Sequence, residues 1–346
     1  MASRYDISFC IPTYNFGAYI GETLDSLIAQ ADDRIQIVIV DGGSTDNTAQ
    51  VVAEKSRQFP HIKFIQRQER SGVDRDILES VAQAEGEYCW LFSSDDCIAP
   101  GAVEFLRGQL GHDWNVFLTD YAVCDLHLNR LNGRAMIPVN DTTSFDWNVP
   151  AERSRYFELA QSPTAFFSFI SAVVVKRDDW MRASPQVEFV GSCWIIAAQL
   201  FGMARERLVV RYHPGELVLN RGENDSFLAR GLVNRFSLSI DGFRKVAEHY
   251  FGINSPESRH VSRAVKNEVP PPALIHCRLR IEDPADRKRL DALVCRQYSD
   301  GSFSDFVRRR FILAPDWLLL SVRSALRLFK SLRRPVSSLE RSTASL

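Results

Sequence analysis

Short apolar runs alternate with stretches of helical periodicity through the first part of the chain. The apolar runs predict four strands, at residues 7–11, 35–40, 62–65 and 88–92. Apolar residues at helical spacing predict the intervening helices, at about 19–28, 47–57 and 72–84. Because strands and helices alternate, we expect an α/β fold with a mostly parallel sheet, right-handed crossovers and flanking helices.

Composition limits the classes of protein that this chain can be. Its 346 residues are 45% hydrophobic and 25% charged, which predicts a globular protein with a large core. A formal net charge of -1 gives no overall attraction to nucleic acid, so no nucleic-acid partner is expected. The seven cysteines are scattered without a CxxC pair, which favours a reducing compartment. The sequence shows neither a secretory signal nor a membrane-spanning run, so we expect a cytoplasmic protein.

Two adjacent aspartates, Asp95 and Asp96, follow the predicted strand at 88–92. They fall at its carboxyl end, where open α/β sheets bind their ligands. Because neighbouring carboxylates repel each other, a site that keeps both ionised usually holds a cation. Mg²⁺ or Mn²⁺ suits oxygen ligands and often bridges to a substrate phosphate. The alternative is a solvated loop in which Asp96 caps the helix that begins near Pro100.

A second polar turn, at residues 41–48, follows the strand at 35–40. Its glycines permit a tight turn and close approach by a ligand. Ser44, Thr45 or Asp46 can cap the next helix, which alone explains most of this composition. Asp41 comes too early to be that cap, and its carboxylate can accept hydrogen bonds from a base N–H or a ribose hydroxyl. No GxxxxGK[ST] or GxGxxG is present, so a P-loop or dinucleotide site is poorly supported.

Four blocks in this order, at 11–15, 40–48, 84–88 and 94–96, resemble those of a family 2 glycosyltransferase with the GT-A fold. The resemblance covers about the first hundred residues and implies a sugar-nucleotide donor, a divalent metal and transfer to an acceptor hydroxyl. It further implies that Pro12 and Tyr14 line the base pocket and that Asp41 contacts the base or ribose. Asp95 and Asp96 fall on the metal and diphosphate motif of the family, with Asp96 as a catalytic residue.

The chain departs from the family pattern around this motif. Ser93 stands where the usual motif has an aspartate, but we expect metal binding by Asp95 and Asp96 to survive. Residues 72–76 replace the usual Ala-Arg-Asn block. There Arg75 is a candidate contact for the diphosphate, and Asp76 for the donor sugar or ribose. The alternative is a helix surface that carries solvated charges.

The general base and the phosphate clamp are less well matched. Inverting relatives have a Glu-Asp pair before a helix in the second half, whereas residues 189–196 contain no carboxylate. Glu188 is the nearest candidate base; otherwise another acid serves, or a retaining front-face displacement needs no dedicated base. Arg221 matches the arginine of the Arg-x-His loop that closes over the diphosphate in the family, and Glu223 replaces the histidine.

Residues 12–17, 72–76 and 191–194 look most like the abequosyltransferase-type branch of the family. Those enzymes transfer a 3,6-dideoxyhexose from a CDP-sugar to a lipid-linked O-antigen unit. A donor without its 3- and 6-hydroxyls implies an apolar pocket. The candidate walls are Phe166, Phe167, Phe169 and Trp194, although core packing is the more common role of aromatic residues.

The carboxyl-terminal part of the chain has a different pattern. A helical period runs from about 231 to 250, and three prolines at 270–272 mark a candidate boundary. A helix at 317–334 would place Arg323, Arg327, Lys330 and Arg334 on one face. Since the implied acceptor is lipid-linked, we expect this basic helix to bind the inner face of the cell membrane, as a peripheral protein. The alternative is a helix that docks on the main domain with its basic face in water.

The predicted organisation is therefore a GT-A domain at 1–230, with a nucleotide-binding half at 1–100 and an acceptor half at 101–230, a helical extension at 231–302 and a basic membrane segment at 303–346. Three functions remain possible from the sequence. The first is a metal-dependent glycosyltransferase. The second is a nucleotidyltransferase, which predicts a Gly-rich, Lys-bearing signature near the first strand, although residues 11–17 contain no lysine. The third is a silent GT-A domain that binds a sugar nucleotide.

Overall fold

The four predicted strands of the first part of the chain are confirmed in the computed structural model, which describes residues 4–184 and 186–321. They are β1 (Tyr5–Thr13), β2 (Ile35–Asp41), β3 (Ile62–Gln66) and β4 (Gly86–Leu91). Every residue of β2 is buried, as expected of a strand covered on both faces. Its one polar residue before the carboxyl end, Gln36, accepts hydrogen bonds from Ser8 Oγ of β1 at 2.7 Å and from Glu85 N at 2.9 Å. Gln36 thus ties three chain segments together inside the sheet.

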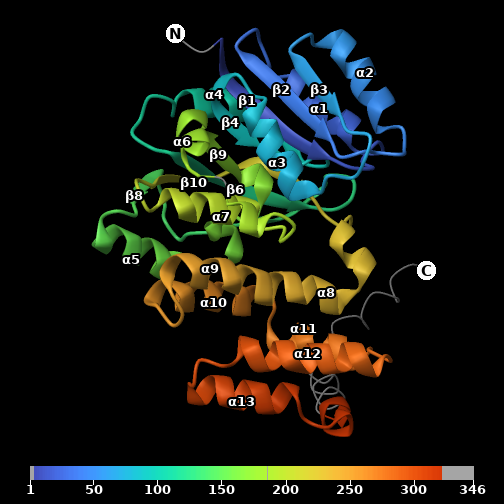
Figure 1. Cartoon of the computed structure of the whole chain (residues 1–346), viewed down its shortest axis with the longest axis vertical. Helices are drawn as coiled ribbons and strands as arrows, with labels where there is room; N and C mark the ends of the chain where they lie inside the picture. The colour runs from blue at the N-terminus through green and yellow to red at the C-terminus, as the bar shows by residue number, and fades with distance from the viewer. Residues whose placement is uncertain (1–3, 185, 322–346) are drawn as a thin grey trace, which may run out of the picture. The chain divides into compact units, whose positions relative to one another are not determined.

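The sheet contains ten strands within the described residues, and its main order is β3-β2-β1-β4-β9-β6-β10-β5 (Figure 1). Strands β3, β2, β1 and β4 are mutually parallel, as predicted. Beyond β4 the sheet is mixed: β9 is antiparallel to both β4 and β6, while β10 is parallel to β6. The remaining strands are β5 (Cys97–Ile98), β6 (Val116–Cys124), β7 (Arg130–Arg134), β8 (Thr143–Asp146), β9 (Val173–Lys176) and β10 (Val209–Arg221).

Helices with an apolar face cover the sheet. In α1 the buried residues Ile20, Leu24 and Leu27 recur at helical spacing. Eight of the nine residues of α7 are buried, so this helix lies inside the protein. The predicted helical stretch at 231–250 is α8 and α9, joined by a π-helical turn at Leu238–Gly242. The helices are α1 (Ile20–Ile28), α2 (Thr48–Gln58), α3 (Val73–Ala82), α4 (Ala102–Arg107), α5 (Pro150–Leu159), α6 (Arg177–Arg182), α7 (Ile195–Met203), α8 (Leu232–Ser237), α9 (Phe243–Phe251) and α10 (Pro256–Glu268).

The chain forms two compact units, Met1–Glu268 and Val269–Leu346. The division falls beside the three prolines at 270–272, and α8, α9 and α10 pack with the first unit. The functional division at 230 and 302 that the sequence suggests stays a prediction.

The second unit contains α11 (Pro271–Arg278), α12 (Pro284–Gln297) and α13 (Phe303–Ile312), and residues 316–321 are also helical. The buried guanidinium of Arg278 fastens these helices: its Nε lies 2.9 Å from Asp291 Oδ1 and its Nη1 lies 3.1 Å from Asp316 Oδ1. Most of the basic helix predicted at 317–334 lies outside the described residues. Over residues 4–184 and 186–321, no helix is both long and apolar enough to cross a membrane.

Candidate active site

The carboxyl ends of β1, β2 and β4 meet at one edge of the parallel half of the sheet. Thr13 and Asp41 are register partners, and Gly42 N donates to the Thr13 carbonyl at 2.9 Å. Just past the end of β4, Phe92 N donates to the Cys10 carbonyl at 2.9 Å. Asp95 and Asp96 follow in the turn between β4 and β5. The chain leaves β1 toward β2 and β3 on one side and returns to β4 on the other, so this edge is the topological switch point where α/β sheets bind ligands.

Asp96 is the more enclosed of the two adjacent carboxylates, with 1% of its surface exposed. Its Oδ2 accepts from Ser171 Oγ at 2.6 Å, and its Oδ1 accepts from Asn220 Nδ2 and Arg221 N, both at 3.0 Å. Burial, together with the charge of Asp95, raises the pKa of Asp96 to about 7. These hydrogen bonds therefore hold the Asp96 side chain in place. Ionisation of its buried carboxyl group costs free energy, which a bound cation would offset.

Asp95 is partly exposed and keeps more freedom to meet a ligand. Its Oδ1 accepts from Ser93 Oγ, and its Oδ2 accepts from Asn224 Nδ2 at 2.6 Å. Burial raises the pKa of Asp95 as well. The hydroxyl of Ser93 thus orients a neighbouring carboxylate at the position where the family pattern has an acid of its own.

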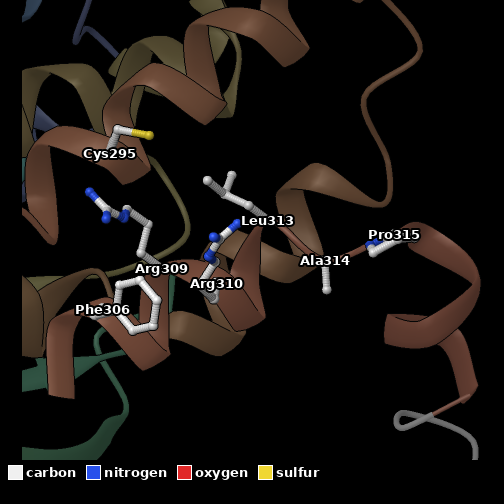
Figure 2. Close-up of a pocket in the computed structure, with 7 residues that line it drawn as sticks. All are labelled: Cys295, Phe306, Arg309, Arg310, Leu313, Ala314 and Pro315. Carbon is white, nitrogen blue, oxygen red and sulfur yellow. The ribbon is translucent and has the colours of Figure 1, made fainter. Parts of the chain in front are cut away.

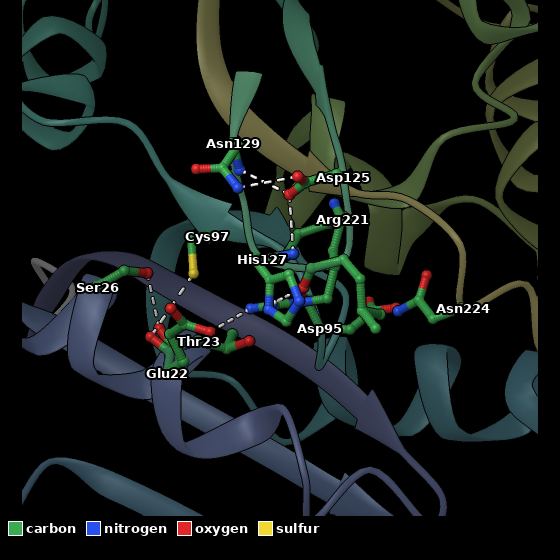
Figure 3. Close-up of polar contacts among 12 residues, drawn as sticks. Glu22, Thr23, Ser26, Asp95, Cys97, Asp125, His127, Asn129, Arg221 and Asn224 are labelled. Atoms are coloured by element: carbon green, nitrogen blue, oxygen red, sulfur yellow. Dashed lines mark hydrogen bonds and ion pairs between the residues drawn. The ribbon is translucent and has the colours of Figure 1, made fainter. Parts of the chain in front are cut away.

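Arg221, at the end of β10, is buried beside this turn. Figure 3 shows its side chain between Glu22 of α1 and the Asp95 turn. Its Nε donates to the Asp95 carbonyl at 2.8 Å, its Nη1 to the Leu126 carbonyl at 2.7 Å and its Nη2 to Glu22 Oε2 at 2.6 Å. The sequence suggests that Arg221 grips a phosphate, but in this structure its guanidinium fastens three protein segments together.

Asp41 and Asp76 form a second acidic group at the end of β2. Asp41 is fully buried: its Oδ1 accepts from Ser44 N at 2.9 Å, whereas its Oδ2 has no partner in the described part of the chain. Asp76 of α3 accepts from Ser71 Oγ. Burial is the main cause that raises the pKa of Asp76 to about 6, with smaller contributions from the charges of Glu79 and Asp41. A Cβ at Gly42 would lie 2.6 Å from Asp76 Oδ2, so the glycine makes room for this carboxylate.

The other predicted nucleotide contacts lie near this edge of the sheet with different exposure. Pro12 is buried in β1 opposite Val40. Tyr14 is partly exposed, and the guanidinium of Arg70 lies 4.3 Å from the centre of its ring. Arg75 is exposed on α3, and it makes no ion pair with any residue that the structure describes. Tyr14 and Arg75 are thus accessible to solvent, whereas Pro12 lies inside the sheet.

Asp74 of α3 binds the loop before α7. Its Oδ2 accepts from Gly191 N at 2.7 Å and Cys193 N at 2.9 Å. These amides point toward one carboxylate because Gly191 and Cys193 have positive φ angles of 92° and 68°. Within the described residues the other oxygen of Asp74 has no partner, and burial raises its pKa. A carboxylate from α3 thus lies against the loop that carries the Glu-Asp pair in inverting relatives.

Glu188, the candidate base, lies in a 3-10 turn at Val187–Phe189 before the same loop. Its side chain is 49% exposed, and its Oε1 lies 3.6 Å from His249 Nε2 of α9. Glu188 is therefore accessible to solvent, and no contact joins it to the two carboxylates after β4 in the described structure.

The proposed apolar walls divide into two groups. Phe166 and Phe167 are buried in the aromatic core around Trp147 and Phe201, where core packing, the alternative reading, explains them. Phe169 and Trp194 are partly exposed. Phe169 packs on Tyr121 with ring centres 4.2 Å apart, and Trp194 Nε1 donates to the Leu238 carbonyl at 2.8 Å. Of the four, only the second group thus has surface that solvent can reach.

Comparison with known proteins decides the family. The family model described as "Glycosyl transferase family 2" matches residues 8–170 of this chain. The chain is also 30% identical to the abequosyltransferase RfbV of Salmonella typhimurium over 273 residues, which are 76% of this chain and 81% of RfbV. The chain belongs to glycosyl transferase family 2. The expected resemblance is confirmed, and this glycosyltransferase is a relative of an abequosyltransferase.

Solved structures show that the glycosyltransferase has the GT-A fold. TarS 1–349 of S. aureus, in complex with UDP-GlcNAc, has a TM-score of 0.60 at 15% identity over 89% of this chain and 86% of TarS. The mannosyltransferase PcManGT of Pyrobaculum calidifontis, in complex with GDP-Man and Mn²⁺, has a TM-score of 0.53 at 17% identity over 96% of this chain and 83% of PcManGT. At these identities the likeness establishes the fold alone.

The carboxylates of this family 2 chain fit a divalent cation. Each oxygen of Asp95 has one protein donor, which leaves lone pairs for a metal, and both aspartates have a raised pKa that a cation would lower. Asp96 accepts three hydrogen bonds on its two oxygens, so it has fewer lone pairs left for a metal than Asp95 has. No cluster of three or more His, Cys, Asp or Glu able to hold a metal occurs in residues 4–184 and 186–321. A cation there would need donor phosphate oxygens or water to complete its coordination.

Several site residues of the glycosyltransferase are not evident from the sequence. Ser171, Asn220, Asn224 and Asp74 reach the site from segments about 75 to 129 residues away from their partners. No local pattern marks such contacts, because the fold alone brings these segments together. The sequence gives only a weak indication that Arg70 lies at the site, because Arg70 is one cation in the polar run after β3.

Proposed function

We propose that this glycosyltransferase moves a 3,6-dideoxyhexose, such as abequose, from a CDP-sugar to a hydroxyl of a lipid-linked oligosaccharide in O-antigen or surface polysaccharide synthesis. The observation that carries the proposal is the identity to the abequosyltransferase RfbV, which extends over 76% of this chain, well beyond the nucleotide-binding half. TarS and PcManGT, which share the fold, were solved with UDP-GlcNAc and with GDP-Man and Mn²⁺. Sugar nucleotides thus bind two proteins of this fold.

The donor nucleotide would bind across the ends of β1 and β2. The unpartnered Asp41 Oδ2 supplies a buried acceptor for a base N–H or a ribose hydroxyl, and Asp76 supplies a second acceptor beside it. Tyr14 offers an aromatic face, with Arg70 above it, and Pro12 forms the floor. Arg75, exposed and without an ion pair in the described residues, would contact the diphosphate.

Asp95 and Asp96 would hold Mn²⁺ or Mg²⁺ against the donor diphosphate. When bound, such an ion stabilises the negative charge that develops on a departing diphosphate. In the transfer, the acceptor oxygen bonds to the anomeric carbon while the bond between that carbon and the diphosphate oxygen breaks, and the leaving group takes the electron pair. Arg221 keeps the Asp95 turn in position through its hydrogen bond to the Asp95 carbonyl.

The acceptor would enter from the side of α7 and the loop before it. Partly exposed Trp194 and Phe169 offer apolar surface for a deoxygenated sugar. Glu188 is the candidate base for the acceptor proton, since it is accessible and begins this loop. We further propose that the enzyme works at the inner face of the cell membrane through its basic segment, 303–346, because a lipid-linked acceptor is presented there.

The test is a thermal-shift screen of CDP-, UDP-, GDP- and dTDP-sugars with and without Mn²⁺. A ligand at about 100 times its Kd stabilises the native state by about 2.7 kcal/mol, so the correct nucleotide stands out. We expect the largest shift with a CDP-sugar and Mn²⁺. The Asp41→Asn variant should lose that shift, because an amide N–H replaces an acceptor in a buried site. Equal shifts with all four nucleotides, or none, would contradict the donor assignment.

A further inference from the structure

Unit 269–346 contains an open cavity that the chemistry of transfer does not use. Its volume is about 450 Å³, and it lies between α12 and α13. Cys295 of α12 forms one side, Phe306, Arg309 and Arg310 of α13 another, and the turn that begins at Leu313 closes it. Figure 2 shows the side chain of Arg309 extending toward Cys295 and that of Arg310 beside Leu313. Two cations thus share a small space with apolar groups.

Among the described residues, the two arginines of this cavity lack the carboxylate partners that their neighbours have. Arg308 lies 3.7 Å from Asp305 Oδ1, and Arg287 and Arg278 both pair with Asp316. Arg309 and Arg310 make no ion pair with any described residue. Arg310 instead lies 5.5 Å from the ring centre of Phe306. Guanidinium groups left unpaired against apolar walls attract an external anion, and their fork geometry suits a phosphate.

Large apolar side chains of α13 and of the helical residues just after it face solvent, and we call them the apolar rim. Phe303 is 81% exposed and Trp317 is 69% exposed. Phe303, Val307 and Phe311 recur at helical spacing on α13, and all three are exposed. Aromatic residues beside arginines are typical of surfaces that lie in the headgroup region of a bilayer. A water-soluble phosphate ligand would gain nothing from this apolar rim.

We propose that this cavity binds the phosphate of an anionic phospholipid while Phe303, Phe306 and Trp317 enter the bilayer interface. The inference rests on the proposed membrane association and deepens it, because it names the lipid headgroup and the residues that receive it. Arg309 and Arg310 contact the phosphate, and the apolar rim contacts the acyl region. The occupant is the lipid of a bilayer, and neither free phosphate nor a second copy of this chain.

Cys295 provides a probe inside the cavity. It is the only exposed cysteine of the seven, since five are buried and Cys193 is partly buried. In the full-length protein we expect Cys295 to react rapidly with a thiol reagent. Vesicles of phosphatidylcholine with about a third phosphatidylglycerol should slow this reaction and carry the protein down on sedimentation, since each basic residue near an anionic surface contributes about fivefold in binding. Pure phosphatidylcholine vesicles should neither slow the reaction of Cys295 nor sediment the protein, and inorganic phosphate should not slow the reaction.

The Arg309→Gln/Arg310→Gln variant tests the assignment. Loss of two cations should weaken vesicle binding by about 25-fold and abolish the protection of Cys295. The matched control is Arg289→Gln on α12, which removes an exposed cation that already pairs with Asp286 at 2.9 Å and should bind as the native chain does. Circular dichroism and thermal unfolding of both variants check that α13 is intact.

Each other outcome overturns the proposal. Protection by pure phosphatidylcholine would show an apolar contact without a phosphate site, and protection by inorganic phosphate would show an anion site without a membrane. A Cys295 that reacts slowly without lipid would show that the chain itself, or at high concentration a second copy, covers the cavity. The donor thermal shift, measured on the same variants, should be unchanged. If the native chain itself showed no donor thermal shift, that result would instead count against the proposed function.

Discussion

At the residue scale, two neighbouring carboxylates with the same chemistry have different surroundings. Asp96 is enclosed by three donors from two chain segments, whereas Asp95 is partly exposed between Ser93 and Asn224. The sequence predicts that the pair belongs to a ligand site, because the two acids follow a buried strand at its carboxyl end. It does not predict which of them is enclosed, because Ser171 and Asn220 approach Asp96 from distant segments.

Replacement of Asp96 by asparagine should separate its charge from its structural contacts. The amide oxygen can still accept from Asn220 and Arg221, and its Nδ2 can donate to Ser171 Oγ, so the fold should persist. We expect transfer to fall by about 100-fold or more, because an electrostatic contribution to the leaving group is lost. Asp95→Asn should be nearly as severe. Turnover is measured with donor, Mn²⁺ and acceptor; Asp178→Asn, exposed on α6, is the control. Native-like turnover in both site variants would remove the cation from the mechanism.

The raised pKa values of Asp96, about 7, and Asp76, about 6, give a pH dependence of stability. Between about pH 4 and pH 7 the folded state binds more protons than the unfolded state, so the contribution of these groups to stability falls as the pH rises. Chemical denaturation of the native chain and of Asp96→Asn, each at pH 5 and pH 8, isolates the effect. The variant should gain stability relative to the native chain at pH 8. An unchanged difference at the two pH values would show that Asp96 titrates normally.

At the element scale, the parallel strands were predictable and the mixed half of the sheet was not. Runs such as 35–40 are apolar throughout, which marks a strand buried on both faces. β9 is only four residues long and pairs antiparallel with both β4 and β6, and such pairings depend on long-range register that no local pattern specifies. The contact of α3 with the loop before α7, through Asp74, is hidden for the same reason, since it joins residues 117 positions apart.

Removal of the Asp74 carboxylate should loosen the acceptor side without destroying the nucleotide pocket. In Asp74→Ala the amides of Gly191 and Cys193 lose their shared acceptor, and the loss of two hydrogen bonds to a carboxylate releases the loop, although water can reach the exposed Gly191. We expect the KM for the acceptor to rise while the donor thermal shift stays within error. Hydrogen exchange at 190–195 reports the loop directly. Ser56→Ala on α2, which removes a hydroxyl bonded to the Val52 carbonyl, is a control away from the loop. Equal losses of donor and acceptor binding would assign Asp74 to the donor pocket instead.

At the scale of the whole molecule, one unit carries the candidate active site, and the other carries the cavity, whose two arginines have no ion pair among the described residues. In the sequence, the three prolines at 270–272 indicate where the two units divide. The cavity between α12 and α13 has no such signal, because it depends on how two helices of the second unit pack.

A chain that ends at Ser321 tests how much the final segment adds. It keeps α13 and Asp316, and it loses the basic residues Arg323, Arg327, Lys330, Arg333, Arg334 and Arg341. We expect sedimentation with anionic vesicles to weaken by more than the roughly 25-fold expected from the loss of two cations, since each basic residue near the surface contributes about 1 kcal/mol. Donor-dependent stabilisation should not change, because it belongs to unit 1–268. Full retention of vesicle binding would exclude the final segment from the membrane contact.

The side chain of Arg221 has a consequence for engineering new specificities. It comes from β10, within the predicted acceptor half, yet it bonds to Glu22 in the first helix and to the backbone of the Asp95 turn. Chimaeras that graft the acceptor half of one relative onto the nucleotide half of another would therefore separate a bonded arginine and glutamate. A successful graft has to transfer the two residues together, even though 199 positions separate them in the sequence.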